Sequence, residues 1–248
     1  MLKLLCVTAH PDDEAGCFGG VLAKYSEAGA ECSVVCLTAG ERAANRGGIA
    51  EDEGLKAIRR EEFATSCGYL GVTRHEVLNY ADGALNRADF FAVTRDLVRH
   101  IRTFRPHVVV TFGAEGFVTA HPDHGMAGLF TSAAFQFAAR TNRYRKQIEE
   151  GGLSPWQAEK LYYVTTTFTM PERQVVSLAP VTARIDVAKY VTRKIEAFAK
   201  HTTQLPLLPI FENAQRQTGD HELFHLVASK MICPMKMETN LFAGIEDR

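Results

Sequence analysis

The sequence predicts an α/β fold of the Rossmann-like type, in which helices cover both faces of a mainly parallel, doubly wound sheet. Apolar runs of strand length alternate along the chain with segments whose apolar residues follow helical spacing, and this alternation is typical of βαβ units. The 248 residues are 46% hydrophobic and 23% charged, which is enough apolar material for one sizeable core. We therefore expect a single domain over residues 1–248.

The first half of the chain supplies most of the expected sheet. Strands are predicted over residues 2–9, 32–38, 75–79 and 107–112, and helices over residues 15–28, 55–68 and 89–104. The first of these strands is apolar almost throughout, as a strand covered on both faces requires. Gly29 stands where a helix C-cap glycine belongs, and Pro106 closes the helix before the fourth strand. The polar stretch 39–54 is predicted to be a loop.

The second half continues the alternation and then departs from it. Helices are predicted over residues 121–140 and 187–201, and residues 161–168 are strand-like. Residues 205–248, which contain Pro206, Pro209 and Pro234, are expected to form an irregular C-terminal cap. The sequence contains no internal repeat and no low-complexity tract.

The charge balance argues against one class of partner. The chain has 28 Lys and Arg residues against 29 Asp and Glu residues, a formal net charge of -1 and a pI near 6.8. Nothing supplies the broad basic surface on which nucleic-acid binding relies. No segment approaches the roughly 18–20 apolar residues of a membrane span, and the short apolar start is interrupted at His10, unlike a signal peptide. We expect no nucleic acid and no transmembrane segment.

The cysteines indicate a reducing compartment. The six of them are scattered through apolar stretches and form no Cys-x-x-Cys pair: Cys6, Cys17, Cys32, Cys36, Cys67 and Cys233. This pattern favours buried thiols over a disulfide framework, so we expect a cytoplasmic protein. The sequence leaves open whether the chain forms a homo-oligomer.

Two polar clusters follow predicted strands. Residues 10–14 (His-Pro-Asp-Asp-Glu) come directly after the first strand, and residues 121–124 (His-Pro-Asp-His) come shortly after the strand that ends at Phe112. Ligands of an open parallel sheet bind beyond the carboxyl ends of the strands, near the point where the strand order reverses. With the common order 3-2-1-4-5, the first and fourth strands are neighbours, and the two clusters would face each other.

The combined clusters offer three imidazoles and four carboxylates in a small volume. Taken alone, either cluster is also explained as a polar turn or a helix cap. Like charges packed so densely oppose folding, however, and a divalent cation relieves their repulsion. Two imidazoles and one carboxylate with an open fourth position are the ligand set of catalytic zinc.

The spacing limits which groups can reach such a metal. On a helix that opens at Pro122, His121 and His124 share a face, so one can ligate the metal while the other lines the substrate side. Asp12 and Asp13 are adjacent and should point in different directions. One of them is then expected to bind the metal, and the other to face the metal-bound water.

These clusters resemble those of the LmbE-like or PIG-L family of metal-dependent de-N-acetylases, of the N-acetylglucosaminyl deacetylase type. The specific part of the resemblance is Ala-His-Pro-Asp-Asp-Glu at residues 9–14, followed by Gly19-Gly20, together with residues 121–124. Weaker matches extend it along the chain: Arg59-x-x-Glu62, Leu70-Gly71-Val72, Asp82-Gly83, Lys194 and His201-x-x-Gln204. The tail beyond these matches agrees only in Glu222-x-Phe224, so it implies nothing about the substrate.

Carried over residue by residue, the resemblance implies that His10, Asp13 and His124 hold zinc (Zn2+) or another divalent transition metal. Asp12 would be the general base. His121, kept charged by Asp123 behind it, would stabilise the oxyanion. Zinc lowers the pKa of its bound water to about 7 and polarises the amide carbonyl, and a nearby carboxylate can accept the proton and return it to the leaving amine.

Two further residues of the resemblance are candidates for substrate binding. Arg59 matches the family's arginine near the site, but an arginine on an exposed helix face is also commonly a solvated charge. Asp82 precedes Gly83 and is equally explained as a turn residue. The sequence leaves both alternatives open.

The resemblance implies a hydrolase that removes an acetyl group from the amide nitrogen of an N-acetylated sugar or sugar conjugate by means of metal-bound water. The alternative is a metal-dependent amidase that acts on thiol conjugates or other acyl amides, because its site chemistry would be the same. A nucleotide-binding module is disfavoured, since no G-x-G-x-x-G follows the first strand and the acidic turn there would repel a pyrophosphate. A metal-storage protein would leave Asp12 without a role.

Overall fold

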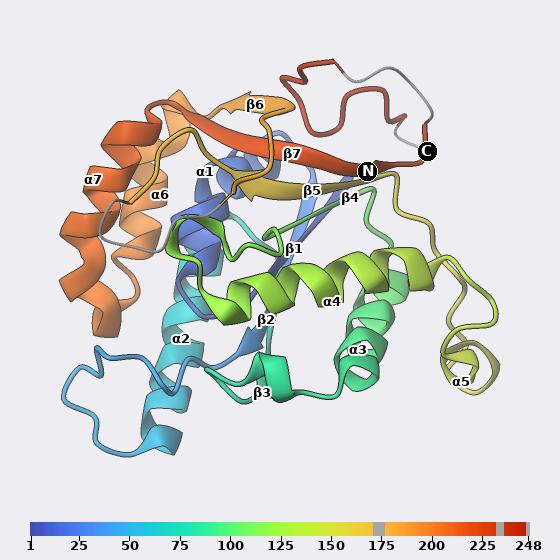
Figure 1. The fold of residues 1–248 in the computed structure, drawn as a ribbon, viewed down its shortest axis with the longest axis horizontal. Coiled ribbons are helices and arrows are strands. Elements are labelled where there is room, and N and C mark those ends of the chain that lie inside the picture. Colours follow the sequence, from blue (N-terminus) through green and yellow to red (C-terminus); the bar gives the residue numbers. More distant parts are fainter. Residues whose placement is uncertain (171–176, 232–235, 247–248) are drawn as a thin grey trace.

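The computed structural model describes residues 1–170, 177–231 and 236–246, which form a sheet covered by helices (Figure 1). The described strands form one seven-stranded sheet with the order β3-β2-β1-β4-β5-β7-β6. The strands are β1 (Lys3–Thr8), β2 (Glu31–Thr38), β3 (Arg74–Tyr80), β4 (Val108–Thr111), β5 (Lys160–Thr165), β6 (Ala183–Asp186) and β7 (His221–Ser229). The α-helices are α1 (Asp13–Glu27), α2 (Asp52–Leu70), α3 (Phe90–Phe104), α4 (Pro122–Ala138), α5 (Arg145–Glu149), α6 (Val191–Phe198) and α7 (Leu208–Thr218). Short 3₁₀ helices are η1 (Leu85–Arg87), η2 (Phe117–Thr119), η3 (Ala188–Tyr190) and η4 (Thr202–Leu207).

The parallel part of the sheet has the predicted strand order 3-2-1-4-5. β1 pairs in parallel with β2 on one side and with β4 on the other, so the order reverses between β1 and β4. β3 lies beyond β2, and β5 lies beyond β4, both again in parallel. The apolar residues that predicted these strands are buried, including Leu5 of β1, Val34 of β2 and Val109 of β4. The carboxyl ends of β1 and β4 therefore lie next to each other.

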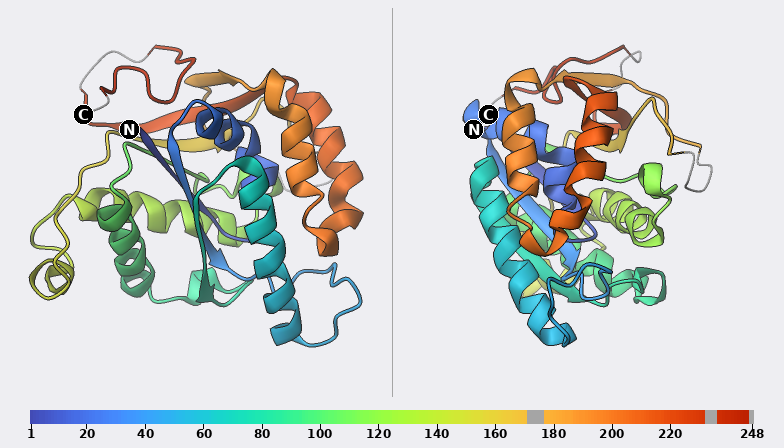
Figure 2. Two further views of the ribbon diagram at one scale, coloured as in Figure 1. Left: turned by 180° about the vertical axis from the view of Figure 1, so that it is seen from behind. Right: turned by 90° about the vertical axis from the view of Figure 1, so that its left-hand side faces the viewer.

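Helices cover both faces of the sheet, as the sequence predicted. α1, α2 and α6 contact one another on one face, whereas α3 packs against α4 on the other (Figure 1, Figure 2). Phe18 of α1, Phe63 of α2 and Phe130 of α4 are fully buried, so the core lies between these helices and the sheet. This arrangement leaves the carboxyl ends of the parallel strands for the two polar clusters.

The C-terminal stretch differs from the irregular cap that the sequence predicted. It contains α7 and β7, and β7 enters the sheet antiparallel to both of its neighbours, β5 and β6. The prolines suggested a break in regular structure, but Pro206 lies within η4 and Pro209 lies in the first turn of α7, where a missing N–H is tolerated. Phe224 of β7 is fully buried in the core. Pro234 lies outside the described residues.

Two further findings concern the described helices and cysteines. In the described part of the chain, the helices are too short or too polar to cross a membrane. Five described cysteines are free, four of them buried and Cys17 half-buried: Cys6, Cys17, Cys32, Cys36 and Cys67. Cys233 lies outside the described residues.

Candidate active site

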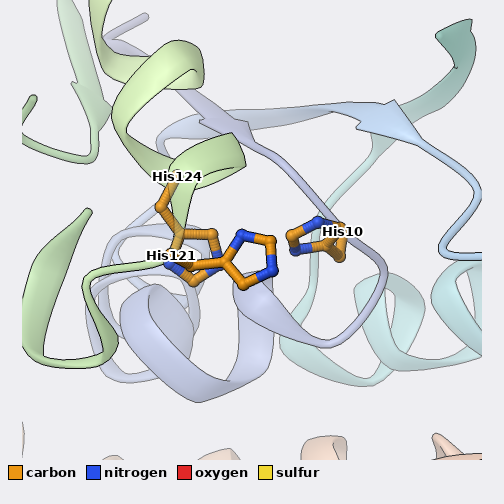
Figure 3. Close-up of side chains that lie close together, drawn as sticks. All are labelled: His10, His121 and His124. Carbon is orange, nitrogen blue, oxygen red and sulfur yellow. The ribbon is translucent and has the colours of Figure 1, made fainter. Parts of the chain in front are cut away.

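Three imidazoles meet where β1 and β4 end. His10 follows β1, while His121 and His124 lie at the start of α4, which follows β4 (Figure 3). The ring centroids are 4.7 Å apart for His10 and His121, 5.3 Å for His10 and His124, and 5.0 Å for His121 and His124. The two clusters predicted from the sequence therefore face each other.

Asp13 lies against two of these imidazoles. Its Oδ1 is 3.1 Å from Nε2 of His124, and its Oδ2 is 3.6 Å from Nδ1 of His10. Oδ2 also accepts hydrogen bonds from the backbone amides of Ala9 and His10, at 3.1 and 2.9 Å. Burial raises the pKa of Asp13, but the neighbouring His124 and His10 lower it more and hold it well below its usual range. The carboxylate is thus ionised and fixed against both rings.

Asp12 has different partners from Asp13. Its backbone is left-handed, with φ of 113° and ψ of -27°, a conformation that costs free energy unless neighbouring groups hold it. The Asp12 amide donates a 2.9 Å hydrogen bond to Oε2 of Glu14, and Oδ2 accepts a 2.8 Å hydrogen bond from Arg59. Burial raises the pKa of Asp12 to about 6, against the lowering effect of Arg59. The adjacent aspartates therefore point in different directions, as their adjacency predicted.

Arg59 lies beneath the site rather than at its surface. It is only 2% exposed, and its guanidinium donates hydrogen bonds to the carbonyl of Gly40 at 2.8 Å, to the carbonyl of Pro11 and to Asp12. The burial contradicts the expectation of a solvated charge, and all three acceptors belong to the protein. Arg59 instead connects the loop after β2 to the loop after β1.

Asp82 and Asp123 flank the far side of the His10 ring. Nε2 of His10 lies 3.1 Å from Oδ1 of Asp82 and 3.5 Å from Oδ2 of Asp123. Both carboxylates also accept hydrogen bonds from backbone amides of neighbouring loops. Burial lowers the pKa of His10, but the carboxylates of Asp123 and Asp82 outweigh this effect and raise the pKa to about 10. Asp82 is therefore a partner of His10 and not only a turn residue.

His121 is the N-cap residue of α4. Its Nδ1 accepts a 3.2 Å hydrogen bond from the backbone N–H of Asp123, so the proton of the neutral ring lies on Nε2. Burial and the nearby His10 and His124 lower the pKa of His121. The structure thus corrects the expectation that Asp123 keeps His121 charged, because the Asp123 carboxylate is directed at His10 and at backbone amides. Because its Nδ1 accepts from the backbone, His121 can donate from Nε2–H.

The donor set suits a divalent transition metal. Among the described residues, two groups have ligand atoms that all lie within 4.8 Å of one another: His10 with His121 and His124, and His10 with Asp82 and Asp123. Despite the nearby carboxylates, Nε2 of His10 is buried without a hydrogen bond to any described residue, and so is Nδ1 of His124. Imidazoles and carboxylates grouped this closely are the donors that zinc prefers. The residues present therefore fit a bound metal.

A cavity of about 770 Å³ opens beside the cluster. Asp12, Asp13 and His124 line part of it, and residues of α7 together with Phe168 and Met170, which follow β5, line much of the remainder. The carboxylate of Asp12 and the metal-ligand candidates thus face one space that can hold a small molecule.

The sequence did not reveal every residue that shapes the site. Phe112, which follows β4, stacks on the ring of His124 with centroids 4.1 Å apart and an interplanar angle of 7°. Glu14 and His201 form a buried pair beneath the loop after β1. Phe211 reaches the cavity from α7. A match to the family pattern marked Glu14 and His201, whereas nothing in the sequence marked Phe112 or Phe211, because only the tertiary structure brings them to the site.

The chain is similar to known proteins over most of its length. A family model described as PIG-L: GlcNAc-PI de-N-acetylase matches residues 5–135, more than half of the 248 residues. The mycothiol S-conjugate amidase of Streptomyces coelicolor is 28% identical, over 99% of this chain and 98% of its own. The 1D-myo-inositol 2-acetamido-2-deoxy-alpha-D-glucopyranoside deacetylase of Rhodococcus opacus is 32% identical, over 84% of this chain and 83% of its own.

Solved structures share the fold. N,N'-diacetylchitobiose deacetylase of Pyrococcus horikoshii superimposes with a TM-score of 0.75 at 24% identity, over 91% of this chain and 83% of its own. The 4-carboxy-2-hydroxymuconate hydratase of Pseudomonas putida superimposes with a TM-score of 0.74 at 21% identity, over 94% of this chain and 99% of its own. Because these two proteins are named for different reactions, the shared fold does not identify the reaction by itself.

Proposed function

Because the chain belongs to the PIG-L family of GlcNAc-PI de-N-acetylases, as its motifs predicted, we propose that it hydrolyses the amide bond of an N-acetylated sugar conjugate and releases acetate. The observation that carries this proposal is the cluster at the ends of β1 and β4. Asp12, Asp13 and His124 line one cavity there, and His10 and His121 lie against His124. The deacetylase of Rhodococcus opacus, which is named for an N-acetylated sugar linked to inositol, supports a sugar conjugate as substrate.

We assign the metal to His10, Asp13 and His124, with zinc or another divalent transition metal as the ion. Such an ion supplies a Lewis acid that polarises the amide carbonyl and lowers the pKa of a water molecule. Asp82 and Asp123 face the nitrogen of His10 that is turned away from Asp13. Carboxylates in this position fix the orientation of a ligating imidazole and raise its basicity.

Asp12 and His121 act on the substrate side. Asp12 is held by Arg59 and lines the cavity, so it is placed to accept a proton from the attacking water and return it to the leaving amine. His121 donates from Nε2–H to the carbonyl oxygen as negative charge develops on it. Arg59 is a positioning residue for Asp12 rather than a ligand of the substrate.

Metal content and amine release, measured on the same preparations, test the proposal. Purified protein is treated with a chelator, reloaded with zinc, and offered N-acetylglucosamine and its conjugates. We expect activity to be lost with the metal and restored with it, because the Lewis acid is required for attack on the amide. Full turnover in a verified metal-free preparation would contradict the proposal.

The relative in Streptomyces coelicolor favours a second candidate, a metal-dependent amidase that acts on thiol conjugates. Both reactions hydrolyse an amide with the same groups, so the site does not separate them. A panel that contains N-acetylated sugars and N-acyl cysteine thioethers does. Amine release from the thioethers alone would favour the amidase, and release from neither class would contradict both candidates.

We also propose that the chain works in the cytoplasm as a single domain, on a small molecule and without nucleic acid. The free, buried thiols Cys6, Cys32 and Cys36 support a reducing compartment. The described strands all belong to one sheet, which supports a single domain. Intact mass measured under non-reducing conditions on protein purified from its own cell tests the first point, since a disulfide would contradict it.

A further inference from the structure

The cavity beside the candidate site is apolar over most of its wall. Asp12, Asp13 and His124 line part of it, and residues of α7 together with Phe168 and Met170, which follow β5, line another part. Most of the side chains that line it away from the cluster are aliphatic or aromatic, including Val164, Phe168, Phe198, Leu207, Ile210 and Phe211. The hydroxyl groups of a sugar find few hydrogen-bond partners on such a wall.

Helix α7 leaves apolar side chains unpacked on this wall. α6 and α7 lie side by side (Figure 1), and Phe211 stacks on Phe198 with ring centroids 4.5 Å apart. Ile210 of α7 also lines the cavity but is 55% exposed, and Leu207, the last residue of η4, is 36% exposed. Exposed apolar side chains in a concave wall are typical of a ligand-binding surface.

Away from the cluster, the charged residues of the wall that the structure describes are Lys194 and Glu222, and they pair with each other. Nζ of Lys194 lies 2.8 Å from Oε1 of Glu222, and the two side chains are only 6% and 3% exposed. Glu222 also accepts hydrogen bonds from the backbone amides of Gly20 and Val21, both at 2.8 Å. This pair therefore serves the contact between α1, α6 and β7 and does not favour an anionic ligand in the cavity.

We propose that this cavity binds an apolar substituent of the substrate, an alkyl or aryl group several carbons long. The inference rests on the proposed amide hydrolysis and names the class of its substrate, an N-acyl sugar-like amide that carries such a group. A cavity of about 770 Å³ falls in the range of roughly 300–1,000 Å³ that buries a drug-sized ligand. Apolar surface removed from water on both the ligand and the wall adds binding free energy in proportion to its area.

The apolar group can lie on either side of the amide bond that is cleaved. On the acyl side it is a longer chain in place of acetyl. On the amine side it is an aglycone attached to the sugar. An apolar acyl group and an apolar aglycone present the same chemistry to the wall. Substrates that vary only one of the two groups are therefore needed to distinguish them.

Two substrate series separate these sources. One keeps the acetyl group and lengthens the aglycone, from methyl to butyl to octyl glycosides of N-acetylglucosamine. The other keeps the free sugar and lengthens the acyl group, from acetyl to butanoyl to octanoyl. With metal-loaded enzyme, we expect kcat/KM to rise about two- to fourfold per buried methylene in one series and not in the other. If kcat/KM stays flat or falls with length in both series, the inference is wrong.

Ile210→Gln places a polar group in the wall without touching the cluster, at a position exposed enough to tolerate it. We expect this variant to lower kcat/KM about tenfold more for the longest substrate of the responsive series than for the shortest. Leu129→Gln is the matched control, because Leu129 is 43% exposed but does not line the cavity. Equal effects of the two variants, or equal losses for short and long substrates, would contradict the inference.

Binding separates a failure of this inference from a failure of the proposed hydrolysis. Methyl and octyl glucosaminides, and acetate and octanoate, are titrated calorimetrically into metal-loaded wild type and Ile210→Gln. We expect octyl glucosaminide or octanoate to bind more tightly than methyl glucosaminide or acetate, respectively, with a more negative heat-capacity change. Ile210→Gln should weaken this gain in affinity. If this holds while no amide is hydrolysed, the hydrolase proposal fails and the apolar site stands. If octyl glucosaminide binds no more tightly than methyl glucosaminide, and octanoate no more tightly than acetate, the apolar site is refuted whatever the activity.

Discussion

Nε2 of His201 lies 2.6 Å from Oε1 of Glu14, and neither side chain has any exposed surface. Glu14 also accepts hydrogen bonds from the Ser66 hydroxyl and from the backbone amide of Asp12, whose conformation is left-handed. Because His201 follows α6, the C-terminal half of the chain helps to hold the loop that carries Asp12. The pair does not line the cavity, so it positions the site from beneath.

We expect Glu14→Gln to lower the free energy of unfolding by about 3–5 kcal/mol, because it leaves the buried His201 without its counter-charge. Urea unfolding at constant pH measures this loss. In the double variant Glu14→Gln/His201→Gln both charges are gone, and part of the stability should return. The pair is not charged if Glu14→Gln lowers the free energy of unfolding by less than about 1 kcal/mol and the double variant recovers none of it.

The guanidinium of Arg59 reaches three acceptors around Asp12, which an ammonium group cannot do. We expect Arg59→Lys to lower kcat about 10- to 100-fold with little change in KM, because the general base is misplaced while the cavity is intact. Steady-state kinetics with one substrate test this. Gly40→Ala is an independent check, since a Cβ there would lie 1.9 Å from the Arg59 guanidinium and displace it. If KM rises while kcat is unchanged, Arg59 contacts the substrate and does not position Asp12.

The parallel half of the fold could be predicted, whereas the antiparallel end of the sheet could not. β1 and β4 are buried on both faces, so their sequences are continuous apolar runs that show the strands directly. β6 has only four residues, and β7 mixes polar and apolar residues such as His225 and Leu226. What places β7 in the sheet is its long-range pairing with β5, which no local pattern reveals.

The residues of the site could be predicted better than their contacts. Motifs at the ends of adjacent parallel strands must meet, so topology alone brings His10 close to His124. The direction of a side chain depends instead on which partners the folded chain offers. Asp123 is directed at His10 and at the loop after β3 rather than at His121, and Arg59 is buried under Asp12. Neither contact follows from spacing along the chain.

We expect His121→Ala to lower kcat about 10²- to 10³-fold while metal content stays near that of wild type, because its Nε2–H is assigned to the developing oxyanion. His121→Asn is the control for the helix cap, since its side-chain oxygen can accept the N–H of Asp123 in place of Nδ1. Metal loss in both variants would make His121 a ligand. Near-normal turnover in both would leave it a helix cap alone.

The last prediction concerns the adjacent aspartates. Oδ1 of Asp13 lies 3.1 Å from His124, whereas Oδ2 of Asp12 lies 2.8 Å from Arg59. We expect Asp12→Asn to keep the metal yet lose most of its activity, because an amide cannot accept a proton from water. Asp13→Ala should instead lose metal affinity, since it removes one of the three proposed protein ligands. Metal stoichiometry and rate, measured on the same samples, distinguish the two outcomes.

Asparagine is the informative substitution at Asp12 because its amide oxygen can still accept the hydrogen bond from Arg59, which limits disturbance of the left-handed loop. Asp13→Asn is the matched variant at the neighbouring position, and we expect it to weaken metal binding because it removes the negative charge that faces the imidazoles. If Asp12→Asn strips the metal while Asp13→Ala keeps it, the two roles are reversed. If both aspartates can be replaced with metal and activity retained, the cluster is structural, and hydrolysis at this site is refuted.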